Sequence, residues 1–124
     1  MELNKEIELN LKLKIISVFD PAERLDELKE IPELPTGQID YWQASKLLCE
    51  KDGGRMPTVE ELQLISAADR AGLIDTGLEY RDDWFWSSKK DSLCTAWNVS
   101  YSNGIEDADS KGFSDCKVLC IRKD

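Results

Sequence analysis

Residues 53–62 read Gly-Gly-Arg-Met-Pro-Thr-Val-Glu-Glu-Leu, and this stretch separates two predicted helices. The paired glycines end the first helix, because glycine adopts the left-handed backbone conformation that often closes a helix. Pro57 then precedes Thr58 and Glu61, which have the spacing of a capping box, in which two side chains satisfy backbone N–H groups at a helix start. The stretch therefore predicts a helix, a tight turn and a second helix in the middle of the chain.

The helix before this stretch is expected over residues 41–51, with Asp40 as its N-cap. Trp42 in its first turn is expected to have a structural role. The second helix begins at Thr58, within the stretch, and ends near Gly72, with apolar residues at the 3.6-residue period of a helix that buries one face.

A long strand is expected over residues 6–19, where apolar and charged side chains alternate until the phase shifts at Ile16. The shift indicates either a β-bulge or deeper burial at the end of the strand. A short helix begins at Asp20 and ends at Ile31, because the residue before a proline is disfavoured in a helix. Three further strands are expected over residues 84–88, 94–101 and 117–123, and a long polar loop over residues 105–115. Helices and strands in this order indicate the α+β class.

The chain has 124 residues, a formal net charge of −9 and no histidine. The acidic balance argues against general nucleic-acid binding and against adsorption to anionic membranes. No apolar run is long enough to span a bilayer, and the charged N-terminus lacks the features of a secretory signal, so membrane insertion is not expected and no signal peptide is visible. Without histidine, the common serine and cysteine catalytic pairings and histidine-ligated zinc are excluded, so no enzymatic activity is expected.

Five short elements follow one another between residues 38 and 123. They are Tyr41-Trp42-Gln43-Ala44 through Cys49, the stretch 53–62, Trp84-Phe85-Trp86-Ser87-Ser88, Ala96-Trp97-Asn98-Val99 and Val118-Leu119-Cys120-Ile121-Arg122. In this order they resemble the bacterial and phage family DUF1566, also called the Lcl C-terminal domain. Two features depart from the family pattern: the tryptophan of its G-W-R-L-P-T element is missing, and Met56 replaces the leucine.

The resemblance implies a C-type-lectin-like fold, in which two helices pack on a small twisted antiparallel sheet. Residues 38–124 would form this domain, and residues 1–37 would add a strand, a short helix and a loop that extend the domain or begin it. Structural roles are expected for Trp42, Arg55, Pro57, Thr58 and Trp97.

The four cysteines allow three pairings, and the resemblance implies Cys49–Cys120 and Cys94–Cys116. The alternative is four reduced, buried thiols in a cytoplasmic protein. If the bridges form, the protein is expected at a cell surface, in a secreted form or on a virion. A four-cysteine zinc site is disfavoured, because no two cysteines have the two-residue spacing that such sites use, and no metal is expected.

The resemblance also implies a ligand face at the sheet edge and the loops around residues 79–92 and 101–115. The residues expected to contact a ligand there are Trp84, Trp86, Tyr101, Asn103, Glu106, Asp107 and Asp109. Aromatic side chains on such a face stack on sugars or anchor a protein partner. The alternative is that they fill a small β core.

The oxygen-rich run between Asn103 and Ser110 raises the question of calcium, which takes roughly six to eight oxygen ligands. Its spacing does not fit an EF-hand, Asn98 is followed by Val99 where the lectin calcium motif has aspartate, and no Glu-Pro-Asn occurs. A solvated acidic loop without a cofactor is therefore expected, with calcium as the alternative.

These observations predict a non-catalytic module that recognises a protein or a glycan, as the resemblance implies for adhesins and phage receptor-binding proteins. The acidic run favours a basic partner. The alternative is a structural or assembly protein that forms homo-oligomers through the strand at residues 6–19, since an exposed edge strand invites pairing.

Overall fold

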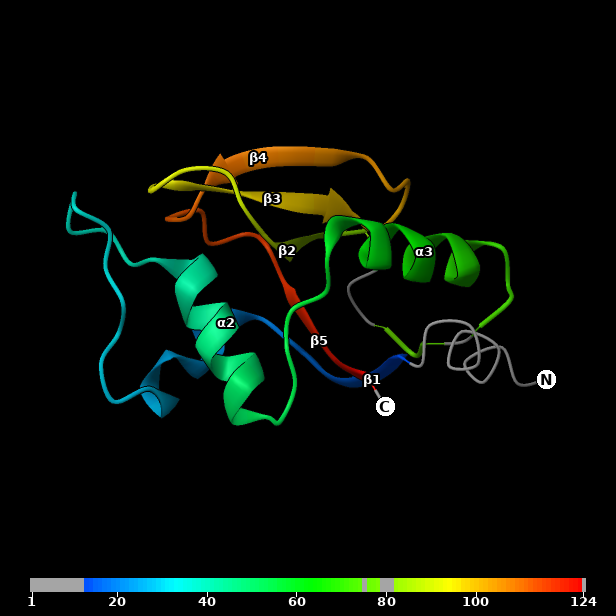
Figure 1. The fold of residues 1–124 in the computed structure, drawn as a ribbon, viewed down its shortest axis with the longest axis horizontal. Helices are drawn as coiled ribbons and strands as arrows, with labels where there is room; N and C mark the ends of the chain where they lie inside the picture. The colour runs from blue at the N-terminus through cyan, green and yellow to red at the C-terminus, as the bar shows by residue number, and fades with distance from the viewer. Residues whose placement is uncertain (1–12, 75, 79–81, 124) are drawn as a thin grey trace.

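The computed structural model describes residues 13–74, 76–78 and 82–123, and the fold is of the predicted α+β class. Its elements in chain order are β1 (Leu13–Phe19), the 3₁₀-helix η1 (Pro21–Glu27), α2 (Tyr41–Lys51), α3 (Val59–Arg70), β2 (Trp84–Lys90), β3 (Thr95–Ser100), β4 (Glu106–Ser110) and β5 (Val118–Lys123). Figure 1 shows β1 and β5 side by side below the other three strands, with α2 and α3 towards opposite ends of the molecule.

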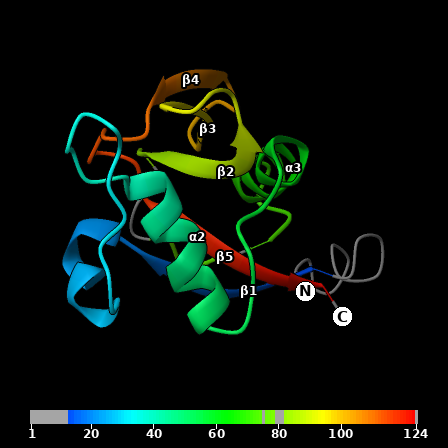
Figure 2. The ribbon, with the colours of Figure 1, turned by 60° about the vertical axis from the view of Figure 1, so that its left-hand side comes forward.

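The strands form two small antiparallel sheets. β1 pairs with β5, and β2, β3 and β4 form the second sheet in that order. Lys117 joins the two sheets, because its backbone N–H donates to the carbonyl of Trp84 and its carbonyl accepts from the N–H of Trp86. Figure 2 shows α2 lying across the β1–β5 pair, with β2, β3 and β4 above it. Among the described helices, none is long and apolar enough to cross a membrane.

Two clusters of buried side chains form the core. The α3 cluster contains Leu13, Val59, Leu62, Ile65, Ala68, Ile74, Leu78, Phe85, Val99, Tyr101, Leu119 and Ile121. The α2 cluster contains Phe19, Trp42, Leu48, Cys49, Met56, Trp86, Ala96, Cys116, Val118 and Cys120. Because side chains alternate between the two faces of a strand, the neighbours Phe85 and Trp86 belong to different clusters. The same strands therefore hold both halves of the core together.

β1 forms the second half of the strand predicted over residues 6–19, and residues 6–12 lie outside the described residues. A β-bulge falls between Ile15 and Ser17, which is one of the two outcomes that the phase shift at Ile16 indicates. The extra residue, Ile16, changes which face the following side chains occupy. Ile15 and Val18 therefore both pack against the α3 cluster although they are three positions apart, and Ile16 packs against the α2 cluster.

The helix predicted from Asp20 to Ile31 is shorter than expected, because η1 is a 3₁₀-helix that ends at Glu27. Asp20 caps it as predicted, and its side chain accepts a hydrogen bond from the N–H of Ala22 at 3.0 Å. Leu28 already has an extended backbone. The poorer hydrogen-bond geometry of 3₁₀-helices keeps them short, so this helix stops before any proline can end it.

The polar loop predicted over residues 105–115 contains a strand, β4, so this prediction was wrong. Asn103 and Gly104 form the turn that returns the chain against β3, and Gly104 has a φ of 77°. β4 pairs with β3 in a register that sets Ala108 opposite Trp97. A strand at the edge of a sheet can pair through its backbone alone, so its polar side chains give no alternating apolar pattern.

α3 begins with the predicted capping box. The Thr58 hydroxyl accepts from the N–H of Glu61 at 3.1 Å, and the Glu61 carboxylate accepts from the N–H of Thr58 at 2.8 Å. The guanidinium of Arg55 donates to both oxygens of the same carboxylate, at 2.8 and 2.9 Å. Hydrogen bonds from Arg55 hold the pKa of Glu61 below its usual value. Arg55 thus connects the turn after α2 to the start of α3.

A disulfide joins Cys49 in α2 to Cys120 in β5, which is one of the two pairings that the resemblance implies. The second bridge, Cys94–Cys116, is not formed, and both residues are free thiols. Cys94 is half-buried just before β3, whereas Cys116 lies in the α2 cluster. Burial raises the pKa of Cys116 far above its usual value, so it stays protonated and lacks the thiolate form that reacts in disulfide exchange.

Arg24 ties η1 to the end of α2. Its guanidinium donates to both oxygens of Asp52 at 2.8 Å, and to both oxygens of Glu27 at 2.7 and 2.8 Å. It also lies 4.3 Å from the centre of the Phe19 ring. The hydrogen bonds from Arg24 lower the pKa of Glu27 to about 2 and hold the pKa of Asp52 below its usual value.

The disulfide predicts the number of reactive thiols. When the protein is denatured and alkylated without reductant, mass spectrometry should find two modified cysteines, and after reduction it should find four. The bridge closes a loop between residues 71 positions apart, which in the chain-entropy account stabilises the fold by ~4 kcal/mol. Reduction should therefore lower the midpoint of urea unfolding. Four modified cysteines without reductant would contradict the pairing, and the Cys94→Ala variant serves as a control that keeps it.

The Arg24 contacts predict how stability changes with pH. The folded-state pKa values of Glu27 and Asp52 both lie below the usual ones, so both carboxylates stabilise the fold above those usual values and lose this contribution in acid. For Glu27 the stabilisation is complete above about pH 4.5 and is lost as the pH falls towards about 2. Arg24→Met removes the main cause of both shifts, so the free energy of unfolding should fall less steeply across this range than in the wild type. Urea unfolding at several pH values measures this, with Lys29→Met as control. Equal slopes for Arg24→Met and the wild type would refute the assignment.

Candidate functional site

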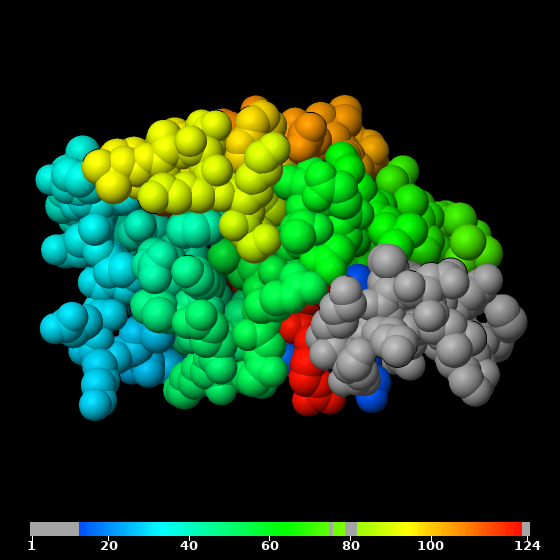
Figure 3. Space-filling model, in the orientation of Figure 1, coloured from blue at the N-terminus to red at the C-terminus, as the bar shows by residue number. Residues whose placement is uncertain are grey.

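The candidate site is the outer edge of the three-stranded sheet, which is formed by β4 and the β3–β4 turn. β4 has β3 on one side and, among the strands described, none on the other. Four of the predicted ligand residues lie on this surface, which we call the β4 edge: Asn103, Glu106, Asp107 and Asp109. Figure 3 shows β4 along the upper border of the molecule.

The β3–β4 turn is held by hydrogen bonds on both sides. The side-chain oxygen of Asn103 accepts from the N–H of Ile105 at 3.0 Å, and the N–H of Gly104 donates to the carbonyl of Ser100 at 2.7 Å. The side-chain amide of Gln63 in α3 donates to the carbonyl of Gly104 at 3.0 Å. Asn103 therefore shapes the turn, and α3 fixes the position from which β4 starts.

The three acidic residues of β4 differ in exposure. Asp109 is half-buried, and its carboxylate accepts from the side-chain amide of Asn98 at 2.8 Å. Asp107 is exposed, and one of its oxygens accepts from the N–H of Ala108 at 2.9 Å. Glu106 is also exposed. Glu106 and Asp107 are thus the carboxylates that the β4 edge presents to solvent.

The predicted ligand-binding aromatics lie mostly in the core. Trp86 is fully buried in the α2 cluster, and Tyr101 is 2% exposed in the α3 cluster. The Tyr101 ring lies 5.4 Å from the ring of Phe85, and its hydroxyl donates to Asp69 at 2.9 Å. Trp84 is half-buried and packs against the α2 cluster. A ligand on the surface cannot stack on Trp86 or Tyr101. Both side chains instead fill the core of the protein, which is the alternative given in the sequence analysis.

Trp42 and Trp97 contribute to packing between elements. The indole N–H of Trp42 donates to the carbonyl of Ser87 at 2.8 Å and so connects α2 to β2. Trp97 is half-buried against the α3 cluster, and the ammonium of Lys89 lies 5.0 Å from its ring. Pro57 is buried immediately before the capping box. In these positions the three side chains pack between elements of the fold.

Lys111 is a buried residue that the sequence analysis did not single out. It is 3% exposed, and its ammonium donates to the carbonyl of Leu93 at 3.0 Å and lies 4.7 Å from the Trp42 ring. Its backbone carbonyl accepts from the N–H of Tyr41 at 2.7 Å. Lys111 thus fixes the segment after β4 against the start of α2. Its polar neighbours in sequence gave no signal, because its burial depends on Trp42, which is distant in the chain.

The acidic residues do not assemble a metal centre. Within residues 13–74, 76–78 and 82–123, no group of three or more histidine, cysteine, aspartate or glutamate side chains is placed to hold a metal ion. Asp107 and Asp109 instead accept hydrogen bonds from β4 and β3. What the β4 edge offers chemically is therefore fixed negative charge.

No protein-family model matches the sequence, and no curated protein matches it. The geometry of the β4 edge is therefore the basis for any functional proposal.

Substitutions of core aromatic residues and of surface acidic residues should differ in their effect on the free energy of unfolding. Trp86→Ala removes a fully buried side chain and should lower the free energy of unfolding by ~3–5 kcal/mol. Glu106→Gln changes an exposed side chain and should alter it by less than ~0.5 kcal/mol. Urea unfolding followed by tryptophan fluorescence and circular dichroism measures both. A stable Trp86→Ala protein would place Trp86 outside the core.

Proposed function

We propose that this chain is a non-catalytic binding module with a C-type-lectin-like architecture, which recognises a basic surface of a partner protein through the β4 edge. The architecture is supported by the paired first and last strands and by the two helices beside a second small sheet. The disulfide between α2 and β5 adds support, because it is the link that the resemblance implies between the first helix of the domain and its last strand. The absence of histidine supports a non-catalytic role.

The observation that carries the proposal is the exposure of Glu106 and Asp107 on a strand whose outer edge is open in the described chain. An open edge offers backbone N–H and carbonyl groups to an extended segment of a partner. Adjacent carboxylates attract lysine and arginine side chains and oppose acidic partners. The two features together select a cationic, extended segment.

The distribution of aromatic side chains favours a protein over a glycan. Sugar recognition commonly uses an exposed aromatic ring. Of the three aromatic residues predicted to contact a ligand, Trp86 and Tyr101 are buried and Trp84 is half-buried; Phe113, after β4, is exposed. The formal charge of −9 also raises the encounter rate with cationic partners, an effect that salt weakens.

The test is an array of cationic, neutral and acidic peptides together with glycans, probed with the labelled protein. The wild type should bind a subset of cationic peptides. The double variant Glu106→Lys with Asp107→Lys should bind them at least roughly tenfold more weakly, because both attractive charges become repulsive. Glu23 and Asp26 are two exposed acidic residues of η1. The matched control changes both to lysine, which alters the net charge of the protein by the same amount as the β4 double variant.

Binding should also weaken as the salt concentration rises, since the carboxylates are exposed. The proposal fails if the wild type binds no cationic peptide, or if the β4 variant and the η1 variant lose binding to the same extent. Binding confined to glycans and unchanged by the β4 variant would replace the protein partner with a sugar.

A further inference from the structure

A second surface feature lies away from the β4 edge, between α2, the turn after it and β2. It is a hollow of about 140 Å³ lined by Trp42, Lys46, Glu50, Arg55, Met56 and Ser88. We call it the α2 hollow. Figure 3 shows the three segments meeting on one face of the molecule. No function discussed above uses it.

The walls of the α2 hollow are fixed before any ligand arrives. The Trp42 indole donates to the carbonyl of Ser87 at 2.8 Å, and the N–H of Ser88 donates to the carbonyl of Pro57 at 2.8 Å. The disulfide from Cys49 holds the same helix against β5. A ligand would therefore meet a preformed surface, which avoids the entropy cost of ordering loops.

The floor of the hollow is apolar. Trp42 is 6% exposed and Met56 is 2% exposed, so each contributes only a small area of ring or thioether. The volume is close to that of an engineered cavity of about 150 Å³ that binds benzene. The hollow therefore suits one group of about six non-hydrogen atoms.

Arg55 retains hydrogen-bonding capacity at the rim. A guanidinium has five N–H donors. Within the described chain, Arg55 uses three of them: Nη1 donates to the carbonyl of Met56 at 3.2 Å and to Glu61 at 2.8 Å, and Nη2 donates to Glu61 at 2.9 Å. The Nε donor and one Nη2 donor share the remaining edge, which matches the two oxygens of a carboxylate. The side chain is 43% exposed, so a ligand can reach this edge.

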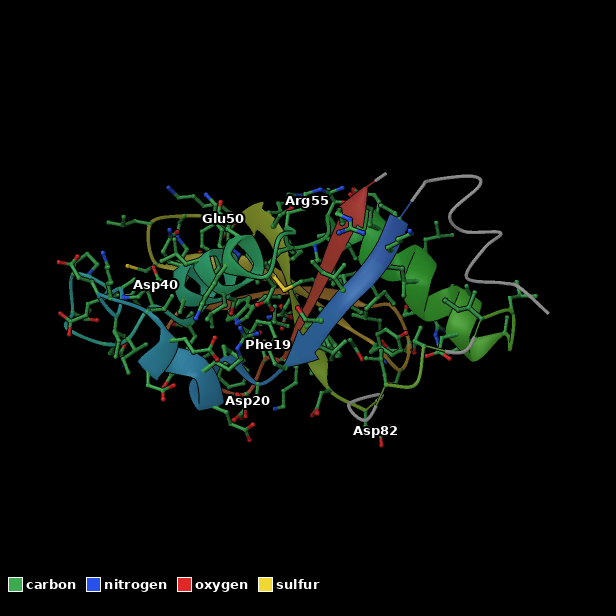
Figure 4. All side chains as sticks on the ribbon, turned by 90° about the horizontal axis from the view of Figure 1, so that it is seen from below. Phe19, Asp20, Asp40, Glu50, Arg55 and Asp82 are labelled. Atoms are coloured by element: carbon green, nitrogen blue, oxygen red, sulfur yellow. A yellow bond between two sulfur atoms is a disulfide. The ribbon has the colours of Figure 1, made fainter. Side chains whose placement is uncertain are left out.

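Lys46 and Glu50 stand one turn apart on the face of α2 that lines the hollow. Both side chains are exposed, and neither forms an ion pair with another described residue. Figure 4 shows Glu50 on α2 and Arg55 after it on the same side of the molecule. The rim thus carries Lys46, Glu50 and the Arg55 guanidinium, which is paired with Glu61 on one edge, around an apolar floor.

We propose that the α2 hollow binds a small zwitterion of the α-amino acid type. Its carboxylate would bind the open edge of Arg55 with Lys46 beside it, its ammonium would bind Glu50, and a short apolar side chain would rest on Trp42 and Met56. A zwitterion carries no net charge, so the formal charge of −9 does not repel it. A doubly charged phosphate would meet repulsion from both Glu50 and the protein as a whole.

L-valine is the probe, titrated into the ¹⁵N-labelled full chain and followed by NMR. The Trp42 indole and the Ser88 amide should shift together and saturate with a Kd of about 1 mM. L-valinamide lacks the carboxylate and N-acetyl-L-valine lacks the ammonium, so each should bind at least roughly tenfold more weakly than L-valine. Because the hollow is separate from the β4 edge, the charge-reversed β4 variant should bind L-valine as the wild type does.

Three variants assign the contacts. Lys46→Met and Glu50→Gln change exposed side chains of α2 and should each weaken L-valine binding roughly tenfold. Arg55→Lys keeps the charge but loses the paired donors, and should weaken binding at least as much. Lys90→Met and Glu23→Gln are matched controls on exposed residues elsewhere, and should leave binding unchanged.

Circular dichroism shows whether each variant is folded. If Arg55→Lys is destabilised, the two single variants Lys46→Met and Glu50→Gln are sufficient to test the proposal. The proposal is overturned if L-valine causes no saturable shift at the Trp42 indole or the Ser88 amide. It is also overturned if L-valinamide and N-acetyl-L-valine bind as tightly as L-valine, or if the α2 variants bind as tightly as their controls.

Discussion

The covalent link between Cys49 and Cys120 is the constraint on which the rest of the structure depends. It holds the last turn of α2 against β5, and at this contact the chain passes so close to β5 that only glycine fits at position 54, where an added Cβ would meet the carbonyl oxygen of Ile121. The turn after α2 then pairs with β5 through Arg55 and Ile121. Once this junction is set, α3 starts from a fixed point and β1 can pair with the other edge of β5.

Local signals in the sequence were sufficient for the elements that local chemistry determines. Thr58 and Glu61 predicted the start of α3 because both partners of the capping box lie within four residues, and the phase shift at Ile16 indicated a bulge or deeper burial because alternation is a local pattern. β4 was missed because its position is determined by pairing with β3, and its own side chains are polar on both faces except at Ala108. Lys111 was missed for the same reason, since its environment is made by residues far away in the chain.

The residues predicted to form a ligand face lie in two different environments. Its acidic members share one surface because they lie consecutively on β4 or in the turn before it. Its aromatic members do not join them, because small sheets need large side chains to fill the space beneath, and Trp86 and Tyr101 fill it. Composition alone could not divide the aromatics between core and surface, since that division depends on which face of β2 and β3 the helices cover.

The negative charge of β4 also has a consequence for the behaviour of many copies in solution. An uncovered strand edge is the usual starting point for edge-to-edge stacking into fibrils, because it presents unpaired backbone groups to any similar edge. Two β4 strands that approached one another would bring Glu106 and Asp107 of each copy into proximity, and like charges repel most strongly at such short range. The same side chains that would attract a cationic segment in the proposed function should therefore oppose polymerisation of concentrated protein through this edge.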